Sequence, residues 1–233
     1  MSSRQEEKER RRKEREERER AEAQKAAGKR RLQLVAGGVL ALVAVAAVVA
    51  AIASSGGKSK ADATLATAPI PTQKIANFDE AVKAAGCQFK TFPSEGRTHL
   101  ASDTAVNNKY KTNPPTSGAH RPTPAADGVY AVNNAPAKEA AVHSLEHGRI
   151  ELEYKPGTSK QVQNQLNALF NEKLKGVPGY HQLLFQNQTN MPFQVAAVAW
   201  THYLGCPTMN NKVFDAMRAF RTRFVDKGPE LIP

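Results

Sequence analysis

Hydrophobic and polar positions divide the chain into four stretches. Residues 1–31 are charged and polar with almost no apolar side chain, whereas residues 34–53 run without a single charge. Residues 54–74 are rich in Ser, Gly, Ala, Thr and Pro and show no period, which is typical of a flexible tether. From residue 75 onward, apolar residues recur at the spacings of helices and strands. We therefore expect one folded domain over residues 75–233.

Helical spacing predicts several helices within this domain. Each begins near a capping residue and ends at a glycine or at a segment of glycine and proline. The first is expected over 78–86, capped by Asn77 or Asp79, and the second begins within 133–136 and runs to His147. The third begins at Thr158 or Ser159 and runs through Leu174, and the last begins at Asn210 or Asn211 and ends at Gly228.

Alternating residues predict strands between the helices. Short strands are expected at 89–92 and 128–132, and residues 150–154 alternate so that Ile150, Leu152 and Tyr154 would form one buried face. Residues 181–187 and 193–203, joined by a turn-rich segment, are typical of a hairpin. This order of elements predicts an α+β fold, with helices packed on a mostly antiparallel or mixed sheet.

Residues 107–124 form an irregular, proline-rich loop that ends near His120. Prolines exclude a helix or a central strand here and restrict the path of the backbone. Such a loop could hold His120 rigidly, although the same composition also fits a plain connector.

The uncharged stretch at 34–53 has the length that a helix needs to cross a bilayer. A secretory signal is the main alternative, because Ala51-Ile52-Ala53 resembles a cleavage site, but the apolar part of a signal is usually shorter. A buried core helix would need a polar face at this length. We therefore expect a single transmembrane helix.

The flanks of this stretch predict its orientation, because basic residues stay on the cytoplasmic side of a membrane. Lys29, Arg30 and Arg31 precede the span, and Ser54 to Gly57 follow it. We therefore expect a cell-membrane protein with a cytoplasmic amino terminus and an extracytoplasmic domain.

The two cysteines, Cys87 and Cys206, both fall in that external domain. A pair in an oxidising compartment is usually bonded, so we expect a disulfide; two reduced core thiols are the alternative.

The formal net charge is +11, of which +5 falls on residues 1–31 and +6 on the remainder. The first stretch holds thirteen Lys and Arg interleaved with eight Glu, an arrangement that suits i,i+4 pairs on an exposed helix. We expect a helical or disordered tail close to anionic lipid head groups and no nucleic-acid partner.

Candidate chemistry is concentrated in His143-Ser144-Leu145-Glu146-His147-Gly148. On a helix, His143 and His147 lie one turn apart on one face with Glu146 in the same arc, and such a patch could hold a transition metal. The motif also reads H-x-x-E-H, the inverted zinc-peptidase signature. The alternative without a ligand is that both histidines cap the end of a helix.

Several motifs together resemble those of a known family, among them Gly96-Arg97-Thr98-His99, the P-P-T-S-G-x-H run from Pro114 to His120, the H-S-L-E-H-G run from His143 to Gly148, and Pro229-Glu230. The segment from about Gly86 to Glu230 is similar to the domain-of-unknown-function family 3105, found in membrane-anchored proteins of actinobacteria and related groups. The resemblance implies no activity, but it implies that His99, His120, His143 and His147 belong together and that His181 and His202 do not.

The leading hypothesis is an external domain that binds Cu or Zn, with His143, His147 and His120 as ligands and His99 or Glu146 completing the set. The first alternative is an interaction module that binds an envelope protein and uses the histidines as a polar structural core. A metal-dependent hydrolase, with Glu146 activating a metal-bound water, ranks last because the sequence shows no nucleophile elbow or substrate-pocket signature. The sequence does not indicate an oligomeric state.

Overall fold

A computed structural model describes residues 66–105, 109–230 and 232. The charged tail at 1–31, the transmembrane helix at 34–53 and the first part of the tether at 54–74 lie outside these residues and stay predictions. Within the described part of the chain, no helix is both long enough and apolar enough to span a membrane.

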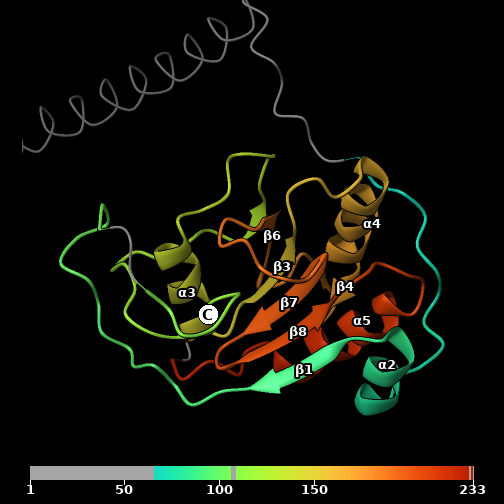
Figure 1. Cartoon of the computed structure of the whole chain (residues 1–233), viewed down its shortest axis with the longest axis horizontal. Helices are drawn as coiled ribbons and strands as arrows, with labels where there is room; N and C mark the ends of the chain where they lie inside the picture. The colour runs from blue at the N-terminus through green and yellow to red at the C-terminus, as the bar shows by residue number, and fades with distance from the viewer. Residues whose placement is uncertain (1–65, 106–108, 231, 233) are drawn as a thin grey trace, which may run out of the picture. The chain divides into compact units, whose positions relative to one another are not determined.

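A mixed sheet forms the centre of the domain (Figure 1). Its strand order is β1-β8-β7-β3-β6-β2. The neighbours from β1 to β3 pair antiparallel, whereas β3, β6 and β2 run parallel. The strands are β1 (Gln88–Thr91), β2 (Gly128–Val129), β3 (Ile150–Tyr154), β6 (Gln182–Gln186), β7 (Val195–Ala199) and β8 (His202–Cys206).

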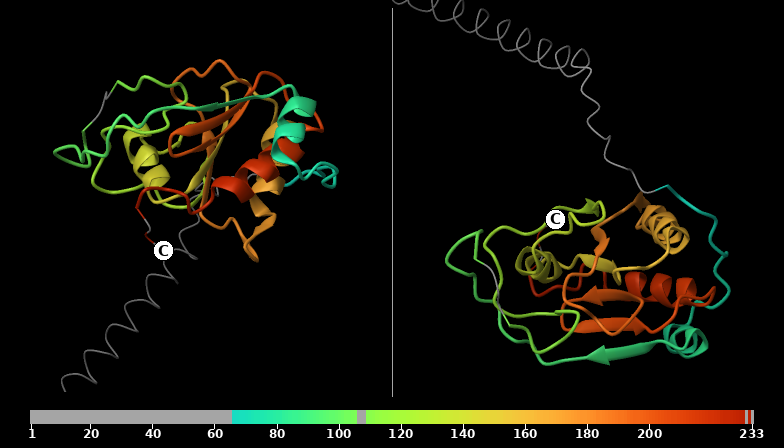
Figure 2. Two further views of the ribbon diagram at one scale, coloured as in Figure 1. Left: turned by 90° about the horizontal axis from the view of Figure 1, so that it is seen from below. Right: turned by 45° about the horizontal axis from the view of Figure 1, so that its top comes forward.

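The helices lie on both faces of this sheet (Figures 1 and 2). On one face, α2, α4 and α5 cover an apolar core that includes Leu152, Leu166, Leu204 and Phe220. On the other face lie α3 and the long segment that precedes it. The helices are α2 (Phe78–Ala85), α3 (Lys138–Glu146), α4 (Lys160–Asn171) and α5 (Val213–Phe224), and a small separate ribbon pairs β4 (Lys173–Leu174) with β5 (Val177–Pro178).

The α+β class and the mixed sheet are confirmed. The ends of the helices also follow local chemistry. Asn77 accepts a hydrogen bond from the amide of Glu80 at the start of α2, and Gly86 ends that helix with a φ of 69°. Ser159 caps α4. In contrast, α3 begins at Lys138, later than predicted, because residues 131–134 form a turn in which the Asn134 N–H donates to the Ala131 carbonyl.

The predicted hairpin of 181–187 with 193–203 is wrong. Strand β3 lies between β6 and β7, and the long apolar run is broken at Trp200 and Thr201, which form the turn between β7 and β8. Thr201 has a φ of 62°. The turn was hidden because it contains no glycine, proline or asparagine.

Strand β3 is buried on both faces, which differs from the one buried face that its alternation predicts. Glu151 and Glu153 are each 2% exposed because α3 covers their side of the sheet. A strand with a helix on either side has no solvent face for its polar residues.

Cys87 and Cys206 form the predicted disulfide, with an S–S distance of 2.02 Å. It joins the start of the domain to the end of β8. The chain just before α2 also packs on the domain, since Arg218 donates to the Pro71 carbonyl and Asp215 accepts from the amides of Lys74 and Ile75. Contacts with the domain therefore begin before residue 75.

Candidate metal centre

The histidine cluster is assembled from three separate parts of the chain. His143 and Glu146 come from the last turns of α3. His99 and His120 come from two segments of the long connection, which meet in an isolated parallel bridge. In that bridge the Leu100 amide donates to the His120 carbonyl at 2.7 Å and the His120 amide donates to the Thr98 carbonyl at 3.0 Å. These bonds hold the two loop histidines beside each other, and the Arg121 amide, which donates to the Glu139 carbonyl at 3.2 Å, joins this loop to α3.

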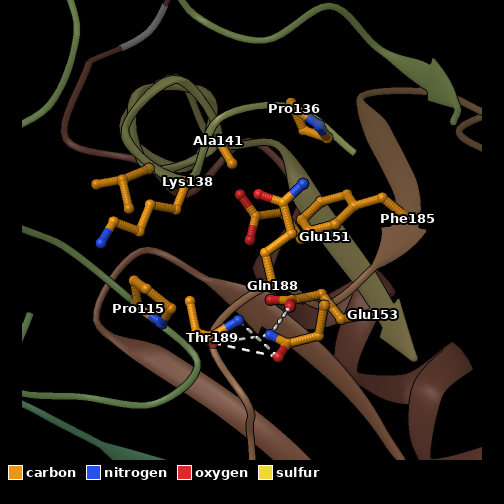
Figure 3. A pocket seen from close by; sticks show the side chains of 11 residues that line it. Pro115, Pro136, Lys138, Ala141, Glu151, Glu153, Phe185, Gln188 and Thr189 are labelled. Carbon is orange, nitrogen blue, oxygen red and sulfur yellow. Dashed lines mark hydrogen bonds between the residues drawn. The ribbon is translucent and has the colours of Figure 1, made fainter. Parts of the chain in front are cut away.

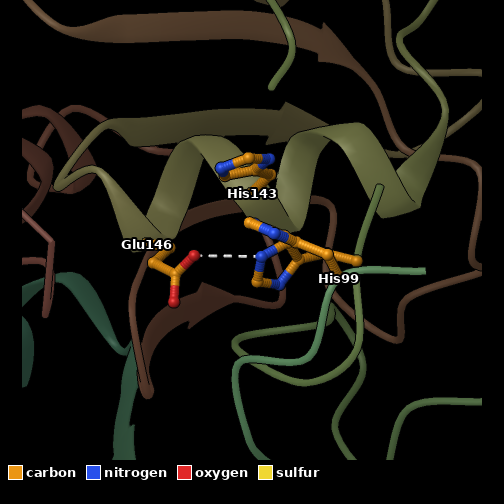
Figure 4. A group of neighbouring side chains, drawn as sticks. His99, His143 and Glu146 are labelled. Carbon is orange, nitrogen blue, oxygen red and sulfur yellow. Dashed lines mark ion pairs between the residues drawn. The ribbon is translucent and has the colours of Figure 1, made fainter. Parts of the chain in front are cut away.

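The three rings lie close together. Ring centroids are 5.0 Å apart for His99 and His120, 4.9 Å for His99 and His143, and 4.6 Å for His120 and His143. One ligand atom from each of these histidines and one from Glu146 all lie within 4.8 Å of one another. Figure 4 shows His99 and Glu146 beside His143 on α3. These four side chains could hold a metal ion.

Backbone carbonyls determine which ring nitrogens are free. His120 Nδ1 lies 2.8 Å from the Gly118 carbonyl, and His143 Nδ1 lies 2.7 Å from the Arg121 carbonyl. A carbonyl oxygen can only accept a hydrogen bond, so Nδ1 carries the proton in both rings. In the neutral rings, each Nε2 then keeps its lone pair for a metal.

Burial favours these neutral rings. His120 is fully buried and His143 is 3% exposed. Loss of hydration lowers the pKa of His120 and of His143, and the neighbouring imidazoles lower both further. Neutral imidazole is the form that binds Zn and Cu, so burial favours the ligand form of His120 and His143.

Glu146 faces this cluster. Its Oε2 lies 3.0 Å from His120 Nε2. Its Oε1 lies 3.7 Å from Arg97, which is largely exposed. Burial, followed by the nearby charge of Glu230, raises the pKa of the Glu146 carboxyl. A cation between His120 and Glu146 would favour the ionised carboxylate and would occupy the imidazole lone pair.

His147 belongs to an adjacent group. Its ring centroid is 4.5 Å from that of His143, and its Nε2 lies 3.3 Å from Glu230 Oε2. His143, His147 and Glu230 also have ligand atoms within 4.8 Å of one another. His143 has one ring nitrogen available to a metal. If that nitrogen binds a metal in one group, His143 cannot be a ligand in the other group.

Close backbone packing brings Glu230 to the site. The Glu230 amide donates to the Glu146 carbonyl at 3.1 Å, and the Asp226 amide donates to the Gly148 carbonyl at 2.9 Å. A Cβ on Gly228 would lie 2.1 Å from the Glu146 carbonyl oxygen. Gly228 therefore lets the carboxyl-terminal segment lie directly on the turn after α3.

Of the residues that the sequence selects, His99, His120, His143 and Glu146 lie in one group, and His147 lies in the adjacent one. The structure adds Glu230, which no local pattern indicated as a ligand. His181 and His202 lie elsewhere: Nδ1 of His181 is 2.6 Å from Asp226 Oδ1, and Nδ1 of His202 is 2.9 Å from the Thr91 hydroxyl. Metal binding by the selected residues stays a prediction.

A family model described as "Protein of unknown function (DUF3105)" matches residues 99–230. The matched region contains all six residues of the two groups. No curated protein and no solved structure matches the chain.

Proposed function

The chain belongs to the DUF3105 family of proteins of unknown function, and we propose that it is a membrane-anchored protein whose external domain binds a transition metal through the histidine cluster. The main support is the orientation of the imidazoles of His120 and His143. Each donates through Nδ1 to a backbone carbonyl, which leaves the lone pair on Nε2, and one ligand atom from each ring and one from Glu146 lie within 4.8 Å of one another.

The buried His120 and Glu146 further support this function. Nε2 of His120 has no hydrogen-bond donor facing it among the described residues, and it lies 3.0 Å from a carboxylate oxygen. Two acceptors this close repel each other unless a proton or a cation lies between them. A metal ion coordinated by both removes that repulsion.

Imidazole nitrogens with one carboxylate suit Zn²⁺ and Cu²⁺. His99 is exposed, whereas the other three members of the group are buried, so the cluster has one side open to solvent. An ion can enter from that side, and a water molecule can take any position that the protein leaves. The site therefore fits metal uptake, storage or transfer outside the membrane.

The proposed location rests on the uncharged stretch 34–53 and on the basic residues before it. The disulfide of Cys87 with Cys206 supports an oxidising compartment. Fusion of alkaline phosphatase, which is active only outside the cytoplasm, tests this in a bacterial host. Fusions after residue 60 and after residue 233 should be active, and a fusion after residue 31 should not. The opposite pattern contradicts the orientation.

Equilibrium dialysis of the full-length chain in detergent against Zn²⁺ or Cu²⁺, followed by elemental analysis, tests metal binding. We expect about one tightly bound ion per chain, since the two groups share His143. His120→Ala and His143→Ala should each weaken binding by about a hundredfold, because each removes a ligand.

His202→Ala is the matched control, because it removes a histidine that lies outside both groups. It should bind the metal as the parent chain does. A chain that keeps its circular-dichroism spectrum and binds neither ion contradicts the proposal. That result would leave the histidines as a hydrogen-bonded structural core, as the interaction-module alternative requires.

A further inference from the structure

A second buried polar site lies on the α3 side of the sheet and shares no residue with the histidine cluster. Glu151 and Glu153 project from the same face of β3 into a pocket beneath α3 (Figure 3). The pocket encloses about 20 Å³, which is room for about one water molecule. It shares lining residues with an outer cleft of about 620 Å³. The shared residues are Pro115, Lys138, Gln188 and Thr189.

Both carboxyl groups are 98% buried, yet one oxygen is unpaired. Glu153 accepts a hydrogen bond from Asn187 Nδ2. Oε1 of Glu151 meets no hydrogen-bond donor among the described residues. Leaving a buried acceptor unpaired is unfavourable, so a donor or cation that reached this oxygen would be held firmly.

The geometry favours an ammonium group over a metal ion. The Asn187 amide oxygen is already bonded to the amides of Thr189 and Met191, which turns its NH₂ donor, not a ligand oxygen, toward Glu153. Calcium and magnesium need about six or more oxygen ligands, counting waters, and the pocket holds about one water. An ammonium group is about the size of a water molecule and carries three donors.

We propose that this pocket binds the ammonium end of a primary alkylamine. Glu151 Oε1 accepts one N–H, and the remaining oxygens of the acid pair accept the others. The ammonium group fills the pocket, and the adjoining methylene groups and the rest of the ligand extend past Pro115 and Thr189 into the outer cleft. Lysine side chains of peptides and free polyamines share this chemistry.

Lys138 is the other charged residue among those that line the pocket. Its Nζ lies 3.8 Å from Glu139 Oε1, and in Figure 3 the amine points away from Glu151. The Lys138 amine therefore does not pair with Glu151, and an external amine can do so. Burial raises the pKa of Glu151 well above its usual range and that of Glu153 to about 7. When Glu153 ionises, Glu151 still holds its proton, so the pair carries one negative charge. A bound ammonium group neutralises that charge.

Calorimetric titration of the full-length chain tests the proposal. The probes are N-acetyl-lysine N-methylamide, putrescine, and the same lysine amide acetylated on its side chain as an uncharged control. At least one amine should bind, the acetylated compound should not, and affinity should rise from about pH 6 to about pH 8 as Glu153 ionises. Binding of the lysine amide indicates a peptide ligand, whereas binding of putrescine alone indicates a free polyamine.

Matched variants assign the binding to the pocket. Glu151→Gln should weaken amine binding by at least about tenfold, because it removes a charged acceptor. Ala141→Leu, which keeps both acids and fills the pocket, should do the same, and Glu80→Gln on the exposed side of α2 should change nothing. The proposal is overturned if neither amine binds at millimolar concentration, if Glu151→Gln binds as well as the parent chain, or if Ca²⁺ or Mg²⁺ occupies the pocket in preference to amines.

Discussion

At the scale of single residues, one hydrogen bond per ring determines what the cluster can bind. The carbonyls of Gly118 and Arg121 fix the proton on Nδ1 of His120 and His143. Both carbonyls lie in the proline-rich connection, which thus carries His120 and orients both rings. The composition of this loop alone did not distinguish a ligand-bearing loop from a plain connector.

The buried acids of β3 give a prediction for stability against pH. Burial raises the pKa of Glu153 from 4.5 to about 7, so folding favours its protonated form. The stability this contributes is fully present below about pH 4.5 and is lost as the pH rises through about 7. Glu153→Gln should therefore stabilise the chain relative to the parent at about pH 8 by at least about 1 kcal/mol, and by less at about pH 5.

Thermal unfolding of both chains at the two pH values measures this difference. Glu80→Gln serves as the control, because Glu80 is exposed. An equal shift for Glu153→Gln at both pH values would contradict the effect of burial on Glu153.

Spacing and chemistry predicted part of the site at this scale. The i,i+4 spacing places His143 and His147 on one face, and their ring centroids are 4.5 Å apart. Glu230 could not be found in this way, because its place depends on tertiary contact between the carboxyl-terminal segment and the end of α3. Burial of Glu151 and Glu153 was also missed, since alternation does not reveal whether a helix covers the second face of a strand.

At the scale of elements, the site depends on where the carboxyl-terminal segment crosses the turn after α3. Gly148 has a φ of 79°, and its Cβ position would lie 2.7 Å from the Asp226 backbone. Gly228 approaches the same turn from the other side. The two glycines let backbone lie on backbone, which places Glu230 beside His147.

Gly228→Ala should therefore disturb this junction. The added Cβ would meet the Glu146 carbonyl oxygen at 2.1 Å, so the segment must shift, and we expect a loss of about 1–3 kcal/mol in unfolding free energy. Chemical denaturation measures the loss. Lys227→Ala, which changes an exposed neighbour, should leave stability unchanged, and equal effects of the two substitutions would contradict the role of this close approach.

Element types followed from the sequence better than strand partners did. The caps of α2 and α4 are local, and in each case the structure has one of the two residues that the sequence offered, Asn77 and Ser159. The placement of β3 between β6 and β7 depends on contacts between residues far apart in the sequence. It pairs β3 parallel with β6 and antiparallel with β7. The apolar run 193–203 concealed its turn because Thr201 adopts a positive φ that its residue type does not signal.

At the scale of the whole molecule, the disulfide ties the first strand region to the last strand. Cys87 and Cys206 are 119 residues apart in sequence. In the chain-entropy model, closing a loop of this size stabilises the folded state by about 4–5 kcal/mol. Cys87→Ser with Cys206→Ser should lower the thermal midpoint by about 10–15 °C.

Differential scanning fluorimetry of the double variant, beside the parent chain with and without reductant, checks this value. The reduced parent should resemble the variant. A double variant as stable as the oxidised parent would show that contacts of the packed domain, not the covalent link, hold these elements together.

The central claim is that one transition-metal ion binds between the buried imidazoles and Glu146. Crystals grown with Zn²⁺ and measured at the zinc absorption edge test it most directly. We expect one anomalous peak about 2.0–2.2 Å from Nε2 of His120 and Nε2 of His143 and from a Glu146 oxygen. A folded domain with no peak at these atoms, or with zinc bound only at surface residues, would contradict metal binding by the histidine cluster.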